Sequence, residues 1–112
     1  MLLRRKTPMA FADNLQTLPA VDHLSAIELI DHSGAVVARI ENKPGQAGSL
    51  RVYAALATKH GAINAAAAQE ALDIYAEHTV DARSNPGKHP NIDRLITLLA
   101  QQATLQARTI AA

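Results

Sequence analysis

Residues 24–42 read LSAIELIDHSGAVVARIEN, and this stretch decides the fold class. Its centre, DHSG at 31–34, is a turn signal, because Asp suits the first position of a tight turn and Gly suits the last, where a positive φ costs nothing. After the turn, apolar and polar residues alternate with the period of a half-buried strand. The pattern therefore predicts an antiparallel β-hairpin with strands at 24–31 and 35–42.

Helical patterns flank the hairpin on both sides. The expected helices span 9–18, 50–60, 65–83 and 92–108, with Ser49, Asn64 and Asn91 as the N-cap residues of the last three. Two strands alone are marginal in water, so the hairpin must lie on helices or on a second copy of itself. The order α–β–β–α–α–α predicts an α+β domain in which a two-stranded antiparallel hairpin packs on about four helices.

Length and composition limit the class of protein. The chain has 112 residues, of which 48% are hydrophobic, so it is too apolar for a disordered chain and long enough for one domain. No stretch rich enough in linker residues divides it. We expect a single domain over 1–112 with an ordered core at about 9–108. The absence of cysteine excludes disulfides, thiolate zinc sites and cysteine nucleophiles, and it fits the cytoplasm.

Charge and aromatic content argue against two classes of partner. Eleven Lys and Arg residues against ten Asp and Glu give a net charge of +1, so no overall field attracts nucleic acid or anionic lipid. Only 3% of the residues are aromatic, which is too few for a base-stacking surface. No run approaches the ~20 apolar residues that span a membrane. We therefore expect neither a nucleic-acid partner nor a membrane.

The loop KPGQAGS at 43–49 is the first candidate site. It follows a predicted strand and precedes a predicted helix, where backbone N–H groups and the helix dipole favour an anion. The candidate ligand-binding residues here are Lys43, Gly45, Gly48, Ser49 and Arg51. The spacing is not that of a P-loop. The alternative is a plain strand-to-helix connection, in which the glycines relieve backbone strain and the serine caps the helix.

The stretch EHTVDARSNPGKHPNIDR at 77–94 is the second candidate site. Its loop and the following helix start offer Lys88, His89, Asn91 and Arg94 to an anionic ligand. The same stretch offers weaker candidates for a metal site, which are His78, Asp81, His89 and Asp93. A pair such as His78 with Asp81 could also act as an acid and a base. The His-Glu-x-x-His metal signature is absent, so we expect no metal and no cofactor. The alternative is a solvated helix face beside a rigid loop.

Two leucines of the last predicted helix suggest self-association. Leu98 and Leu105 are seven residues apart and lie off the expected core stripe. Together with the exposed edge of the hairpin, they predict a homodimer contact. The alternative is that isolated leucines are ordinary surface residues.

Three segments resemble a known family. They read VDHLSAIELID, ENKPGQAGSLRVYAAL and ALDIYAEHTVDARSNPGKHPNIDRL, and their most specific stretches are the KPG loop and NPGKHPNIDRL. The chain resembles, over about residues 12–100, a small bacterial domain of unknown function about one hundred residues long, found mostly in proteobacteria. The resemblance implies a compact cytoplasmic bacterial protein. It brings no activity, substrate or cofactor.

Three functions remain open. The preferred hypothesis is a non-catalytic interaction or structural module that forms a homodimer, since no complete catalytic constellation is evident. The first alternative is a binder of a small anionic or phosphorylated ligand at the glycine-containing loops. The second is a metal-dependent or His/Asp hydrolase. The two hypotheses that need a binding or catalytic site require the polar residues of 77–94 to converge in a concave pocket, whereas the interaction module does not.

Overall fold

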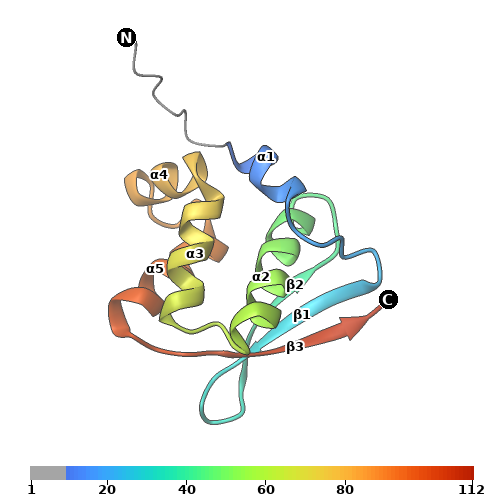
Figure 1. Cartoon of the computed structure of the whole chain (residues 1–112). Helices are drawn as coiled ribbons and strands as arrows, with labels where there is room; N and C mark the ends of the chain where they lie inside the picture. Colours follow the sequence, from blue (N-terminus) through green and yellow to red (C-terminus); the bar gives the residue numbers. More distant parts are fainter. Residues whose placement is uncertain (1–9) are drawn as a thin grey trace.

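The computed structural model of the chain describes residues 10–112 as five helices and three strands (Figure 1). The helices are α1 (Phe11–Gln16), α2 (Ala47–His60), α3 (Ala65–Tyr75), α4 (Glu77–Ser84) and α5 (Pro90–Gln101). The strands are β1 (Leu24–Ile30), β2 (Val36–Glu41) and β3 (Gln106–Ala111). The mixed α+β class is as predicted, but there is one more strand and one more helix than expected. The predicted start of the first helix, at Met9, lies outside the described residues.

The hairpin is confirmed, and local chemistry explains it. Strands β1 and β2 pair antiparallel, with Ile27 opposite Ile40. The Asp31 carboxylate accepts hydrogen bonds from the backbone N–H groups of Ser33 (2.9 Å) and Ala35 (3.0 Å). Gly34 then takes a φ of 89°, which an L side chain rarely adopts. The turn is therefore fixed by its own residues.

The end of the chain departs from the prediction. The last helix was expected to run to Arg108, but α5 ends at Gln101, and β3 pairs antiparallel with the free edge of β1. The sheet order is β2-β1-β3. Apolar spacing alone extended the helix too far, whereas β-branched residues such as Thr109 and Ile110 suit a strand. The pairing itself depends on a partner some eighty residues earlier in the sequence.

Leu98 and Leu105 are buried, so their predicted role as a surface dimer contact is wrong. Their exposed fractions are 6% and 9%, and both belong to the core. The N–H of Leu105 donates to the carbonyl of Ile63, and the Ile63 N–H donates back, both at 2.9 Å. Strand β3 begins immediately after this bridge. Leu105, which was expected on the outer face of the last helix, therefore lies inside the molecule.

The predicted helix over 65–83 is broken at Ala76. This residue has φ 51° and ψ −112°, and it separates α3 from α4. Thr79 Oγ1 donates a hydrogen bond to the carbonyl of Leu72 (2.6 Å) across the break. Helix α4 consequently leaves the line of α3 and packs on α5.

A single cluster of apolar side chains joins the sheet to the helices. Helix α2 packs on the sheet and on α3, and α3 packs on α5, so α2 lies between the strands and the other long helices (Figure 1). The largest fully buried side chains are Tyr53, Ile27, Leu29, Ile40, Leu50, Leu56, Ile63, Leu95 and Val52. Within residues 10–112 no helix has the length and apolar character needed to cross a membrane.

Candidate functional site

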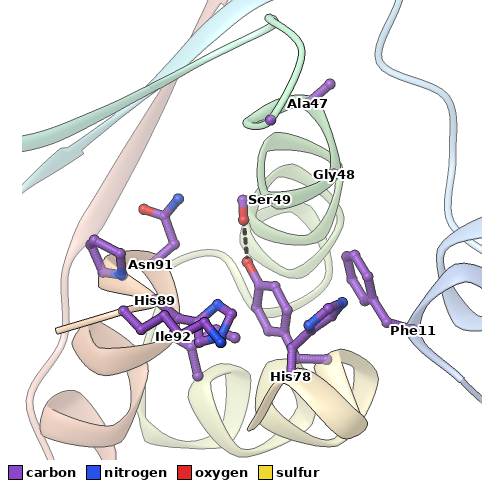
Figure 2. Close-up of a pocket in the computed structure, with 12 residues that line it drawn as sticks. Phe11, Ala47, Gly48, Ser49, His78, His89, Asn91 and Ile92 are labelled. Carbon is purple, nitrogen blue, oxygen red and sulfur yellow. Dashed lines mark hydrogen bonds between the residues drawn. The ribbon is translucent and has the colours of Figure 1, made fainter. Parts of the chain in front are cut away.

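A pocket of about 410 Å³ lies where the starts of α2 and α5 meet the break between α3 and α4 (Figure 2). Figure 2 shows Gly48 and Ser49 across the pocket from His78 and His89. The lining residues are Phe11, Gly45, Ala47, Gly48, Ser49, Tyr75, His78, Lys88, His89, Pro90, Asn91 and Ile92. Both loops singled out in the sequence therefore contribute to the same cavity.

The first loop enters its helix earlier than predicted. The carbonyls of Lys43 and Gln46 accept from the N–H groups of Ala47 (2.8 Å) and Leu50 (3.0 Å), so α2 begins at Ala47. The prediction that Ser49 is the N-cap is therefore wrong, because this residue already lies in the first turn. Its hydroxyl instead accepts a hydrogen bond from the Tyr75 hydroxyl at 2.7 Å (Figure 2). That bond ties the start of α2 to the end of α3.

Helix α1 closes one side of the pocket through Phe11. The Phe11 ring stacks on Tyr75 at 5.1 Å between centroids, with 16° between the ring planes. The Phe11 ring packs directly on Gly48, since a Cβ built on this glycine would lie in van der Waals contact with Phe11 Cζ, at 3.4 Å. The Phe11 N–H donates to Glu77 Oε1 at 2.8 Å. No local pattern indicated this role for Phe11, because the contact joins residues 66 positions apart.

The second loop also starts its helix earlier than expected. Helix α5 begins at Pro90 with His89 at the N-cap position, so the prediction that Asn91 caps the helix is wrong. Proline suits the first helical position because its φ is fixed near the helical value and it has no N–H to leave unpaired. The Asp93 carboxylate accepts from the Gly87 N–H at 2.8 Å and so holds the loop against the helix.

Asp81 is the centre of an ion-pair cluster at the rim of the pocket. Its Oδ2 lies 2.7 Å from His89 Nε2 and 2.9 Å from Lys88 Nζ. Asn85 Nδ2 donates to Oδ1 at 3.0 Å. The bond from His89, and then the bond from Lys88, lower the pKa of the Asp81 carboxyl to about 2. The carboxylate is therefore ionised throughout the neutral range.

His78 does not pair with Asp81, contrary to one of the expected acid–base pairs. Its ring lies instead 5.7 Å from the His89 ring and 5.2 Å from the Phe11 ring, edge-on to the latter. The histidine that pairs with Asp81 is His89, from the loop that follows α4. Two imidazoles thus stand side by side in the pocket, one of them oriented by a carboxylate.

Several hydrogen-bond donors around the pocket have no acceptor among residues 10–112. They include the backbone N–H groups of Gly48 and Ser49 at the start of α2 and of Asn91 at the start of α5. The first N–H groups of a helix have no partner within it, and the helix dipole makes this end favourable for negative charge. Residues with unpaired N–H groups at two helix starts therefore line the same pocket.

Three of the predicted cations, Lys43, Arg51 and Arg94, do not line the pocket. Lys43 Nζ pairs with Glu41 Oε1 at 2.6 Å. Arg51 donates to the carbonyls of Leu18 (2.6 Å) and Pro19 (3.1 Å), which fixes the segment after α1. These contacts direct the first two side chains away from the cavity.

Arg94 does not line the pocket but contacts residues that hold the start of α5. It donates to Asn91 Oδ1 at 2.9 Å and to the Tyr53 hydroxyl at 3.1 Å. The Tyr53 hydroxyl in turn donates to the carbonyl of Asn91. Burial raises the pKa of Tyr53 to about 12, so the phenol keeps its proton and remains a donor. This half-buried network, with the buried ring of Tyr53 at its centre, ties the first turn of α5 to α2.

The four weaker candidates for a metal site are only partly brought together. Asp81 and His89 form a pair and His78 lies beside His89, but Asp93 is bound to the Gly87 N–H and does not line the pocket. Among residues 10–112 no group of three or more His, Cys, Asp or Glu side chains is arranged to hold a metal ion.

Comparison with known proteins identifies a family. No curated protein and no solved structure matches the chain. A family model described as "Uncharacterized protein conserved in bacteria (DUF2322)" matches residues 11–109, which include every residue that lines the pocket. The resemblance to a bacterial domain of unknown function is thereby confirmed. The chain belongs to this bacterial family, whose function is unknown.

Proposed function

We propose that the protein binds a small anionic or phosphorylated ligand in the pocket between α2 and α5. One observation carries the proposal: two loops that lie about forty residues apart in the sequence join in a single cavity and bring unpaired donors to it. The volume of about 410 Å³ falls in the range of small-molecule sites. Phe11, Tyr75 and Ile92 supply apolar walls for an organic part of the ligand.

The charges around the pocket favour a ligand of low negative charge. The Lys88 ammonium and the Asp81 carboxylate largely neutralise each other, since they lie 2.9 Å apart. The remaining attraction comes from the helix starts and from the imidazoles of His78 and His89, which gain charge when protonated.

We also propose that the protein works in the cytoplasm, because the chain contains no cysteine.

The test is a titration with inorganic phosphate and with dimethyl phosphate, followed by NMR of the backbone amides. We expect the signals of Gly48, Ser49 and Asn91 to shift most, because these N–H groups are unpaired at the pocket. Raising the salt concentration should weaken binding, since exposed charges are screened. Shifts confined to other regions of the chain, or none at millimolar ligand, would contradict the proposal.

Two lysine variants form a matched pair. Lys88→Ala removes a cation that lines the pocket and leaves the Asp81 charge in excess, so the affinity should fall. Lys43→Ala removes a cation of the other loop that is paired with Glu41 away from the cavity, so the affinity should stay the same. Equal losses in both variants would mean that only the overall charge matters, and the pocket would not be the site.

A second candidate function is the interaction module in the form of a homodimer. Strand β2 lies at the edge of the sheet, and Val36 and Val37 beside the turn are 48% and 50% exposed. A free strand edge can pair with the same edge of another copy. Light scattering at micromolar concentration tests this, with Val37→Lys as the disrupting variant. A monomeric parent chain would remove this candidate.

A further inference from the structure

The two imidazoles in the pocket differ in their surroundings. His89 Nε2 is held by Asp81 Oδ2 at 2.7 Å, whereas its Nδ1 has no hydrogen-bond partner among residues 10–112. Neither ring nitrogen of His78 has a partner within the same range. The ring centroids lie 5.7 Å apart, so one substrate group can touch both rings.

We infer that the pocket hydrolyses a phosphodiester, with His89 as the general base and His78 as the general acid. This inference rests on the proposed anion-binding function and extends it from binding to a reaction. Pairs of groups in different environments, one of them oriented by a carboxylate, are the usual arrangement for such catalysis. A diester carries one negative charge, which suits a pocket whose only lining lysine is already paired with Asp81 among the described residues.

The step uses water as its only co-reactant. His89, with its proton on Nε2 toward Asp81, accepts a proton at Nδ1 from a water molecule whose oxygen attacks phosphorus. The bond from phosphorus to the leaving oxygen breaks, and that oxygen takes a proton from protonated His78. The products are a phosphomonoester and an alcohol. Exchange of one proton with solvent at each ring then restores both histidines.

Asp81 acts as a positioning residue for His89. Its carboxylate fixes the ring orientation and stabilises the imidazolium that forms when His89 takes the proton from water. Lys88 and Asn85 hold the carboxylate in place, at 2.9 and 3.0 Å. The charged groups that face the pair are thus Asp81 and Lys88 beside His89, with Glu77 beside His78.

The helix starts supply the stabilising donors. Negative charge grows on the phosphoryl oxygens as water attacks, and fixed donors aimed at such charge are often the largest contribution to catalysis. The unpaired N–H groups of Gly48, Ser49 and Asn91 are available for this purpose at the same pocket. They need no rearrangement, because each helix start is fixed by a buried tyrosine, Tyr75 for α2 and Tyr53 for α5.

The experiment measures release of p-nitrophenolate from bis-p-nitrophenyl phosphate, in the presence of a chelator, as a function of pH. We expect a bell-shaped profile, because one histidine must be neutral and the other protonated. His89→Gln and His78→Gln should each lower kcat/KM by about 10²–10⁴-fold. The matched control is His32→Gln, since His32 is exposed in the hairpin turn and does not line the pocket, and its rate should equal that of the parent.

Asp81→Asn separates positioning from simple structural damage. Loss of the carboxylate should lower kcat/KM and also move the acidic limb of the profile to lower pH, because the imidazolium of His89 loses its partner. A loss of rate with an unmoved profile would overturn the role of Asp81.

Dimethyl phosphate serves as a diester that the protein binds without hydrolysing it during the assay. Its binding distinguishes a failure of the catalytic inference from a failure of the proposed binding function. If the parent chain binds it but releases no p-nitrophenolate above the buffer rate, the catalytic inference is overturned and the proposed binding function stands. If the parent binds no phosphate diester at all, the binding function fails as well. A histidine variant that still binds dimethyl phosphate is folded, so its lost rate then reports on chemistry.

Discussion

Replacing Ala76 with glycine should stabilise the protein, although glycine weakens most helical segments. Ala76 separates α3 from α4 with φ 51° and ψ −112°, close to the first central position of a type II′ turn, where glycine dominates. An L residue held in such a region costs about 1–3 kcal/mol. Glycine avoids that cost and loses about 0.5–1 kcal/mol through its greater backbone freedom in the unfolded chain. The difference predicts a gain of roughly 1 kcal/mol.

Urea unfolding measures this gain directly. The midpoint of Ala76→Gly should rise with an unchanged m-value, and the melting temperature should rise by about 4–8 °C per kcal/mol. The matched control is Ala55→Gly in the middle of α2, where φ is negative and the same substitution should destabilise by about 0.5–1 kcal/mol. Two variants with the same chemical change should therefore shift the midpoint in opposite directions.

A lower midpoint for Ala76→Gly would refute the reasoning, since it would mean that the alanine is not strained. The site offers a second check. Because glycine can adopt the same backbone angles, His78 and Asp81 should keep their places, and only the amide signals of residues next to the substitution should move.

Three further predictions concern the core and the site. Tyr53→Phe removes the hydroxyl that donates to the Asn91 carbonyl and accepts from Arg94, so the free energy of unfolding in urea should fall by about 1–2 kcal/mol. Leu98→Ala should cost about 2–5 kcal/mol because the side chain is buried, and light scattering should show an unchanged mass; a near-neutral effect would instead support the surface position predicted from the sequence. The pKa of Asp81 is lower in the folded chain (about 2) than its ordinary value of 3.8, so its contribution to stability is complete above that value and is lost as pH falls toward 2. Urea midpoints measured across this range should therefore fall more steeply for the parent than for Asp81→Asn, and parallel curves would count against the pair.

The amino-acid sequence alone determines those features of the protein that depend only on residues a few positions apart along the chain. The hairpin turn follows from Asp31 and Gly34, whose bonds and backbone angle involve only the next few residues. The same is true of the caps of two helices, since the Asn64 side chain accepts from the Ala67 N–H at 2.8 Å and Gly61 ends α2 with a φ of 79°. Turn and cap chemistry acts over three or four positions, so it can be predicted without the fold.

Some of the candidate site was also visible in the sequence. The loop at 43–49 and the stretch at 77–94 are singled out by their glycines, prolines and polar residues, and both contribute residues to the pocket. Which of their side chains reach the cavity was not visible, because Lys43 has a nearer partner in Glu41. A sequence shows the charge of a residue, but the competition among possible partners is decided by distances across the fold.

Only the tertiary structure decided the features that join distant segments. Strand β3 exists because β1 offers a free edge, and this pairing overrides the helical spacing that continues beyond Gln101. The backbone at Ala76 is strained, because φ is 51°. The fold tolerates this strain through contacts with other elements, such as the hydrogen bond from the buried Tyr75 to Ser49 of α2. Long-range packing and pairing stabilise the fold by more than local propensity opposes it, and local patterns therefore cannot predict such features.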